Sequence, residues 1–294
     1  MGAMTGIQWC DSTVNPVSGC DGCELWQSGK GGPCYAGNLQ TWRLSKSLPH
    51  LYSSNFSEVR TIAGRMAEAA KWGDLRGKGR PGKPWLDGRP RMIFVGDLGD
   101  VLSKGVPFEF LRDEVIDTAR FTPGSRHVWL VLTKRPARLA EFAGWLLLQG
   151  IHWPDNVWAG TSVTDQKTAR TRIPALQEVP AAVRFVSAEP LRGPVDLLDL
   201  GDDVAAFNVW ERKEISWVVV GGESRQNRYE PTPFHLAWAR TLRDQCRNSA
   251  TPFFFKQQGA RPVGSAGVEI DFGSSHGDEW DTIPPDLQIR EVPR

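Results

Sequence analysis

The stretch RMIFVGDLGD at residues 91–100 sets the pattern that decides the fold. An uninterrupted apolar run, MIFV, is followed at once by glycine and two aspartates. Continuous apolar strands of this kind are typical of a parallel sheet with both faces covered. We therefore predict a buried strand here that ends in polar residues.

The same pattern returns along the chain, and a segment with helical character follows most of the strands. The further strands are predicted in HVWLVLTKRP (127–136), NVWAGTSVTD (156–165), VRFVSAEPL (183–191), ISWVVVGGES (215–224) and TPFFFKQQG (251–259), with a first one in 7–17. Helices are predicted at 108–121, 137–148, 166–176 and 233–247, after earlier ones starting at 35–42 and spanning 57–72, and 193–213 is expected to be irregular. Strands that alternate with helices predict an α/β fold with a parallel sheet.

Two architectures fit about seven such strands, an open doubly wound sheet and a full or partial (β/α) barrel. In an open sheet the ligand binds in one crevice, so only the strands beside that crevice need to end in polar residues. In a barrel the site lies at the carboxyl ends of the strands all around. Polar or small residues end six strands here, so we predict a single parallel (β/α) barrel. These residues are Asp97, Asp100, Lys134, Arg135, Thr161, Ser162, Ser187, Glu189, Gly222, Glu223, Lys256 and Gln257.

Three of the five cysteines stand in one loop, NPVSGCDGCELWQSGKGGPCYA at residues 15–36. Cys20 and Cys23 form a C-x2-C pair, and Cys34 follows after a glycine-rich stretch. Glycine tolerates backbone angles that other residues avoid, so such a loop can turn several thiolates toward one point. This favours a metal or cluster site over a loop with incidental thiols.

Two kinds of metal site compete for these thiols. Structural zinc nearly always takes four protein ligands, and the nearest further candidates are Cys10 and His50. A [4Fe-4S] cluster takes one thiolate per iron, so three cysteines leave one iron open to a small molecule. A disulfide framework fits less well, because the cysteine count is odd and the chain is long enough to build a core without crosslinks.

Length and composition indicate a soluble globular protein of 294 residues, 40% hydrophobic and 23% charged. The formal net charge of +1 excludes a global basic field for nucleic acid, although a local patch is still compatible with it. No apolar run is long enough for a membrane span, and we expect a cytoplasmic protein. We expect one domain over 1–294, with a cloning remnant at 1–3, the cysteine loop at 14–36 and an irregular tail at 259–294 that packs across the outside of the barrel.

Residues 73–90 (GDLRGKGRPGKPWLDGRP) are rich in glycine, proline and basic residues and are predicted to form a surface loop. A solvated connector is the simpler interpretation. The alternative is a flap that touches a phosphate-bearing substrate.

Several motifs together resemble a known family. They are the run I-Q-W-x-D-x-T-x-N-P-V-S-G-C and then C-Y-A, followed by LTKRP at 132–136, N-V-W-x-G-x-S-V at 156–163, R-F-x-S-x-E-P-L at 184–191, GPVDL at 193–197, W-V-x-V-G-G-E-S at 217–224 and PFFFKQ at 252–257. In this order and spacing they are similar to the motifs of the phage-encoded three-Cys-motif proteins, a family of unknown function. That family in turn resembles a divergent branch of the radical S-adenosylmethionine (SAM) enzymes. The spacing here is C-x2-C-x10-C, whereas the usual radical SAM spacing is C-x3-C-x2-C.

The resemblance implies a partial (β/α)6 barrel in which Cys20, Cys23 and Cys34 hold a [4Fe-4S] cluster and the open iron binds SAM. It also implies an electron-donor protein such as a flavodoxin or ferredoxin. Strand-end residues suit the remaining roles: Asp97, Asp100, Thr161, Ser162, Gly222 and Glu223 for binding SAM, and Glu189, Glu223 and Lys256 as catalytic or substrate-facing groups. The simpler interpretations are aspartates that cap turns or helices, and an ion pair between Glu189 and Lys134 or Lys256.

Three functions remain open from the sequence. The first is a radical SAM enzyme acting on a nucleotide or nucleic acid, in phage DNA modification or repair. The second is a nucleic-acid-associated protein with a structural zinc or iron–sulfur site. The third is a metal-independent hydrolase or transferase that uses the carboxylates of Asp97, Asp100, Glu189 and Glu223.

Overall fold

The computed structural model describes residues 2–27, 30–201, 214–226, 229–264, 266–271 and 273–294. The segment 193–213 is predicted to be irregular, and its residues 202–213 lie outside the part of the chain that the structure describes. Among the residues described, no helix is both long enough and apolar enough to cross a membrane.

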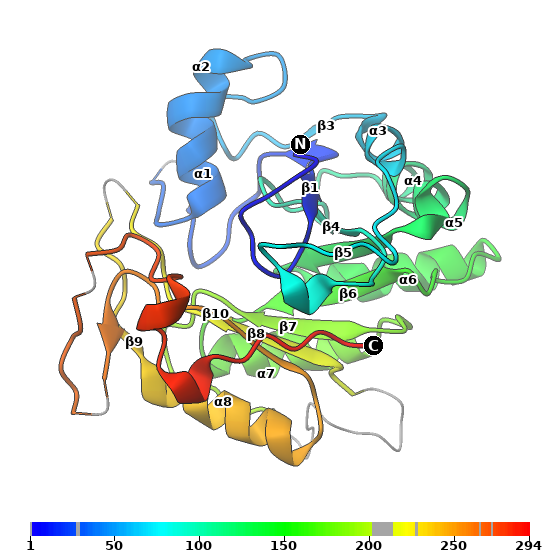
Figure 1. Cartoon of the computed structure of the whole chain (residues 1–294). Coiled ribbons are helices and arrows are strands. Elements are labelled where there is room, and N and C mark those ends of the chain that lie inside the picture. The colour runs from blue at the N-terminus through cyan, green and yellow to red at the C-terminus, as the bar shows by residue number, and fades with distance from the viewer. Residues whose placement is uncertain (1, 28–29, 202–213, 227–228, 265, 272) are drawn as a thin grey trace. The chain divides into compact units, whose positions relative to one another are not determined.

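The main sheet contains seven strands that hydrogen-bond in the order β1-β4-β5-β6-β7-β8-β10 (Figure 1). The strand pairs β1–β4, β4–β5, β7–β8 and β8–β10 are parallel. The order follows the chain without the reversal that defines a doubly wound sheet. The predicted α/β class with a parallel sheet is therefore confirmed. The strands are β1 (Ser12–Val14), β4 (Met92–Val95), β5 (Val128–Thr133), β6 (Val157–Ser162), β7 (Arg184–Ala188), β8 (Trp217–Gly221) and β10 (Phe253–Gln257).

The chain divides into two compact units, and each is described by itself. Unit 1 comprises residues 1–159 and 180–182, and unit 2 comprises 160–179 and 183–294. The boundary falls within β6, so the prediction of one domain stays a prediction.

Unit 1 contains β1, β4 and β5 with their helices and a small antiparallel pair of β2 (Val17–Ser18) and β3 (Arg60–Thr61). The predicted helices at 35–42, 108–121 and 137–148 are present, the first two with a π-helical turn inside. The helices are α1 (Tyr35–Leu39), η1 (Gln40–Leu44), α2 (Ser45–Ser47), α3 (Arg65–Ala70), η2 (Pro84–Leu86), α4 (Phe108–Leu111), η3 (Arg112–Asp117), α5 (Thr118–Arg120), η4 (Gly124–Arg126) and α6 (Pro136–Leu148).

The helix predicted over 57–72 is wrong in its first half. Residues 60–61 form strand β3, and α3 begins only at Arg65, after Gly64 in the left-handed region at φ 81°. The carboxylate of Glu114 accepts hydrogen bonds from the backbone N–H groups of Gly64 (2.8 Å) and Met66 (2.7 Å). A side chain that is distant in the sequence thus accepts hydrogen bonds from the free N–H groups at the start of this helix. A neighbouring N-cap residue normally has this role.

The basic loop 73–90 is not simply a solvated connector, because two of its cations point inward. Arg80 is buried and pairs with the buried carboxylate of Asp11 (Nε to Oδ1, 2.6 Å), while its guanidinium also donates to the carbonyls of Arg89 and Pro90. The ammonium of Lys83 donates to three backbone carbonyls of the segment 5–10, at 2.6–2.7 Å. The loop therefore clasps the N-terminal segment, and these two cations are unavailable to a substrate phosphate.

Unit 2 contains β7, β8 and β10, helices α7 (Gln166–Gln177) and α8 (Leu236–Asn248), and a parallel pair of β9 (Phe234–His235) and β11 (Pro262–Val263). The tail holds two short 3-10 helices, η5 (Trp280–Thr282) and η6 (Pro285–Leu287). Its last residues run beside β10, where Phe255 N–H donates to the carbonyl of Ile289 (2.8 Å) and Glu291 N–H to that of Phe253 (3.0 Å). The tail thus covers backbone groups of a strand that ends the sheet order.

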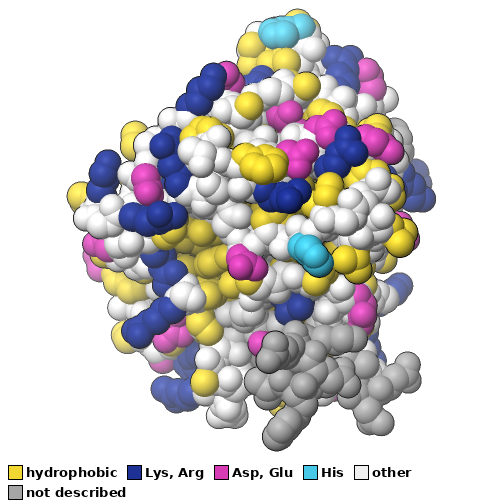
Figure 2. Space-filling model, turned by 90° about the vertical axis from the view of Figure 1, so that its right-hand side faces the viewer, with side chains coloured by type: hydrophobic (Ala, Val, Ile, Leu, Met, Phe, Trp, Pro, Cys, Tyr) yellow, Lys and Arg dark blue, Asp and Glu magenta, His cyan; other side chains and the backbone are white. Residues whose placement is uncertain are grey.

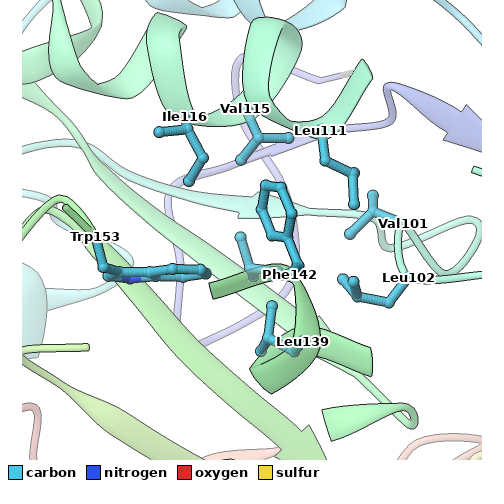
Figure 3. Close-up of a pocket in the computed structure, with 9 residues that line it drawn as sticks. Val101, Leu102, Leu111, Val115, Ile116, Leu139, Phe142 and Trp153 are labelled. Atoms are coloured by element: carbon cyan, nitrogen blue, oxygen red, sulfur yellow. The ribbon is translucent and has the colours of Figure 1, made fainter. Parts of the chain in front are cut away.

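A small apolar cavity of about 10 Å³ lies in the core of unit 1, among side chains from α4, η3 and α6 that point toward one another (Figure 3). Ligand pockets are usually about 300–1,000 Å³, and a wet cavity needs polar partners for its water. The lining is entirely apolar, so this cavity is a packing defect and not a binding site. The lining residues are Val101, Leu102, Leu111, Val115, Ile116, Val131, Leu139, Phe142 and Trp153.

The buried pair of Asp11 and Arg80 generates a stability prediction. Asp11→Asn leaves a buried guanidinium without its counter-charge, so we expect a loss of about 3 kcal/mol in the free energy of unfolding measured with urea. The matched control is Glu68→Gln, which breaks the exposed pair with Lys71 and should change stability little. Equal effects of the two substitutions would contradict the clasp.

Candidate metal and cofactor site

The backbone of the cysteine loop in unit 1 is shaped by two glycines. Gly19 and Gly22 adopt left-handed angles, at φ 79° and 99°. A Cβ on Gly19 would lie only 2.2 Å from the carbonyl oxygen of Glu58, and Cys20 N–H donates to the carbonyl of Phe56 at 2.8 Å. The start of the loop is therefore pinned against the segment 56–58 and has no room for a side chain at Gly19.

The second half of the loop folds back on the first. Cys23 and Trp26 exchange two backbone hydrogen bonds (3.0 and 3.1 Å), and Cys34 N–H donates to the carbonyl of Leu25 (3.1 Å). Cys34 then caps α1, where Asn38 ties the helix to the loop through the carbonyls of Gly32 and Cys34. The inserted residues before Cys34 thus bring it back to the turn that carries Cys23.

Each of the three sulfur atoms accepts an N–H donor. The donors are Leu25 N to Cys23 Sγ (3.4 Å), Gly37 N to Cys34 Sγ (3.5 Å) and the Arg135 guanidinium to Cys20 Sγ (3.6 Å). Hydrogen bonds to sulfur favour the thiolate, which is the form that binds metals, and they tune the potential of iron–sulfur clusters.

Burial works against the thiolate while no metal is bound. Cys20 packs with Trp26 and Phe56 in a small hydrophobic cluster, and Cys34 packs against that cluster. Burial raises the pKa of Cys20 to about 11 and also raises the pKa of Cys34. Both are therefore neutral thiols near pH 7, and a metal that binds them must displace their protons.

The indole of Trp26 presents an unused donor within this cluster. The ring is buried and packs so closely on α1 that a Cβ on Gly37 would lie 2.5 Å from it. Among the described residues its Nε1–H has no hydrogen-bond partner. A buried donor left unpaired costs free energy, so it points to an acceptor that binds beside it.

Arg135 links the loop to the end of β5. Its guanidinium forms ion pairs with Asp21 and with Asp100 (2.6 Å), and donates to the carbonyl of Gly22 (2.6 Å) as well as to Cys20. Asp100 in turn accepts from the hydroxyl of Thr133 (2.8 Å) and from the backbone N–H groups of Lys134 and Leu102. Asp100 is thus an anchor for Arg135, and its predicted contact with SAM stays a prediction.

Asp97 is differently placed. Its carboxylate accepts a short hydrogen bond from Asn15 Nδ2 (2.6 Å). Burial raises its pKa, and hydrogen bonds from Asn15 and Thr13 act in the opposite direction. Its charge also contributes to raising the pKa of Tyr35 and Tyr52, after burial, which is the larger cause for both. The predicted contact of Asp97 with the SAM ammonium stays a prediction.

In unit 2, Glu189 and Lys256 form the ion pair that the sequence offered as the simpler interpretation, at 2.8 Å. The hydroxyl of Ser187 lies 3.4 Å from the other carboxylate oxygen of Glu189. A Cβ on Gly221 would lie 2.7 Å from the Glu189 carboxylate, so glycine there gives this side chain its place. The predicted catalytic role of Glu189 and Lys256 stays a prediction.

Gly222, predicted to bind the cofactor, packs against the protein's own backbone. A Cβ on Gly222 would lie 2.3 Å from the carbonyl oxygen of Gln258, so packing leaves no room for a side chain there. Glu223 is buried, accepts from Thr232 N–H (3.2 Å) and lies 3.6 Å from the Arg192 guanidinium. The predicted roles of Gly222 and Glu223 in binding SAM stay predictions.

Thr161 and Ser162, at the end of β6, are both buried. The carbonyl of Ser162 accepts from Arg172 (2.8 Å). The predicted site residues therefore fall into two groups, one in each unit: the cysteines with Asp97 and Asp100 in unit 1, and the others in unit 2. Sequence reasoning missed the roles of Arg135 and Trp26, although LTKRP and the CELW turn carried the signal.

Among the described residues, no three Cys, His, Asp or Glu side chains stand close enough to hold one metal ion together. A [4Fe-4S] cluster attaches each thiolate to a different iron, so its cysteine sulfurs lie further apart than the ligands of one ion. The fit of the loop to such a cluster is therefore judged from the surroundings of each sulfur.

Comparisons with known proteins place the chain by family alone. The model of a family described as "Protein of unknown function (DUF5131)" matches residues 4–284. No curated protein and no solved structure matched the chain.

The loop geometry predicts which cysteines matter for metal uptake. Cys34→Ala should lose most of the iron bound after anaerobic reconstitution, because its thiol lies in the loop. Cys10→Ala and Cys246→Ala are the controls and should keep their iron. Cys246 is a buried core thiol whose pKa burial raises to about 12, and Cys10 is buried outside the loop. Iron loss in Cys10→Ala as large as in Cys34→Ala would show that the ligand set is wrong.

Proposed function

The chain belongs to the family described as DUF5131, and we propose that it is a radical SAM-type enzyme whose Cys20, Cys23 and Cys34 hold a [4Fe-4S] cluster. The observation that carries the proposal is the set of donors around the cysteines. All three sulfurs accept an N–H, and the ring of Trp26, which packs in one cluster with Cys20, carries a buried Nε1–H that has no partner among the described residues.

These surroundings suit a cluster better than incidental thiols. Iron–sulfur clusters carry negative charge spread over cysteine and inorganic sulfur, and N–H groups are the donors that stabilise it. An unpaired indole N–H in an otherwise apolar cluster of side chains is costly unless such an acceptor arrives. Cys20 and Cys34 also share one small core, so both thiols are held against the same group of side chains.

When bound, a cluster with one open iron supplies the electron that cleaves the sulfonium of SAM and yields a 5′-deoxyadenosyl radical. This chain's own residues would do the remaining work in unit 1. Arg135 holds the loop in position through Asp21, Gly22 and Asp100. Asp97, fixed by Asn15, would accept the SAM ammonium. The packed Trp26 and Phe56 would exclude water from Cys20.

Unit 2 holds the other residues of the proposal. We assign Glu189, Glu223 and Lys256 as catalytic groups, and Thr161, Ser162, Gly222 and Glu223 as cofactor-binding residues. Glu189 and Lys256 hold each other as an ion pair, and Gln257 donates to Ser224 Oγ (2.8 Å), so these side chains are pre-positioned within unit 2.

The fold part of the proposal is a partial (β/α)6 barrel of the radical SAM type. The strand order that follows the chain supports it, as does a cysteine loop that begins directly after β1. The partners proposed with it are a small electron donor such as flavodoxin or ferredoxin, and a nucleotide or nucleic-acid substrate in a cytoplasmic, phage-related setting. No membrane partner is proposed.

The proposal predicts SAM cleavage. Reconstituted protein, reduced without oxygen and given SAM, should release 5′-deoxyadenosine and methionine, which chromatography separates and quantifies. Cys20→Ala, Cys23→Ala and Cys34→Ala should each abolish the product. Asp97→Asn should weaken SAM binding roughly tenfold while it keeps the iron, because one charged hydrogen bond is lost.

Metal analysis of the same preparations separates the alternatives. Near-stoichiometric zinc, with no 5′-deoxyadenosine, would replace the radical proposal with a structural metal site. Protein that stays free of metal and still turns over a substrate would favour the carboxylate hydrolase. Fully loaded iron–sulfur protein that neither binds nor cleaves SAM would also refute the radical proposal.

A further inference from the structure

The helical segment that directly follows Cys34 exposes aromatic rings. It runs through α1, η1 and α2, the light blue coil in Figure 1. Tyr35 is 56% exposed and Trp42 is 48% exposed, at the surface of a protein that buries most of its other large aromatic side chains. About half of each ring is thus open to solvent and available to a partner.

The same segment is locally basic. Residues 25–57 contain no Asp or Glu, whereas Lys30, Arg43 and Lys46 are among them. The chain as a whole has 35 basic and 34 acidic residues, and the two signs are interspersed over the face shown in Figure 2. The segment itself therefore carries basic and no acidic side chains, although Asp97 from elsewhere in the chain acts on Tyr35.

The helix is fixed to the cysteine loop. Gln40, at the start of the π-helical turn, is fully buried. Its Oε1 accepts from Gly19 N–H (3.1 Å), and its Nε2 donates to the carbonyl of Ser53 (3.0 Å). Anything that docks on the rings of Tyr35 and Trp42 is thus held at a set position relative to Cys20 and Cys34.

We propose that this helix is a docking surface for single-stranded nucleic acid, with Tyr35 and Trp42 as stacking platforms and Arg43 and Lys46 as phosphate contacts. Aromatic rings interleaved with basic residues are the usual recognition surface for single strands, because every base has a π-face. The two rings are seven residues apart, about 10 Å along a helix, which is about three nucleotides at the rise of a stacked strand. The inference rests on the proposed function and narrows its substrate from a nucleotide or nucleic acid to single-stranded nucleic acid.

The test is the binding of a fluorescein-labelled oligothymidine to the full-length protein, followed by fluorescence anisotropy without reconstitution of iron. Tyr35→Ala and Trp42→Ala should each raise the Kd about tenfold, because one stacked base is lost. Arg43→Glu with Lys46→Glu should weaken binding and flatten its salt dependence. Because Arg43 and Lys46 are exposed, their double variant still tests the docking surface if an aromatic variant misfolds.

The matched control is Phe121→Ala. Phe121 is 60% exposed and lies beneath the Arg120 guanidinium, so it combines an exposed ring and a cation away from the cysteine loop. Binding should not change in this variant. An equal loss in Phe121→Ala, no binding by the unaltered protein, or equal competition by polyglutamate would overturn the proposal, the last in favour of an acidic protein partner.

Oligonucleotide binding and SAM cleavage are measured independently, so the docking surface and the proposed function can be refuted separately. Oligonucleotide binding that depends on Tyr35 and Trp42 supports the docking surface even if no 5′-deoxyadenosine is formed. Protein that cleaves SAM and does not bind the oligonucleotide overturns the docking surface alone.

Discussion

The ion-pair network of Arg135 is the constraint on which the candidate site depends. One guanidinium, just after β5, reaches Asp100 after β4 and Asp21, Gly22 and Cys20 in the cysteine loop. Backbone hydrogen bonds and the packing of Trp26 on Phe56 shape the loop itself, and Arg135 ties that loop to the ends of β4 and β5. Arginine suits this task because its planar group donates in several directions at once and keeps its charge. The sheet thereby sets the position of the loop.

The strands and the overall class could be predicted from the sequence because they follow local rules. Apolar runs such as MIFV before Gly96 are typical of a parallel sheet that is covered on both faces. Polar residues at the ends of the strands indicate the functional edge of that sheet. The cysteine loop could also be predicted, because glycine is the residue that most easily adopts the left-handed angles found at 19 and 22. The candidate ligands Cys20, Cys23 and Cys34, and the pairing of Glu189 with Lys256, came from the same kind of argument.

The rest depends on partners distant in the sequence. Glu114 supplies the cap of α3 from 48 residues away, so no pattern within 57–72 could show where that helix begins. Arg80 and Lys83 look like solvated cations in a glycine- and proline-rich loop, and become buried only because Asp11 and three carbonyls meet them. The sequence marks Gly222 only as a small residue at a strand end, and the contact with the backbone of Gln258 that requires glycine there comes from the fold. Such contacts are properties of the fold and not of a segment.

The most direct measurement of the central claim is a Mössbauer spectrum of protein reconstituted with ⁵⁷Fe, recorded with and without SAM. The claim is that three thiolates leave one iron of a [4Fe-4S] cluster open and that SAM binds it. The account predicts that SAM changes the signal of one iron in four and leaves the other three as they were. A cluster spectrum that SAM does not alter would contradict it, because every iron would then already have its full set of ligands.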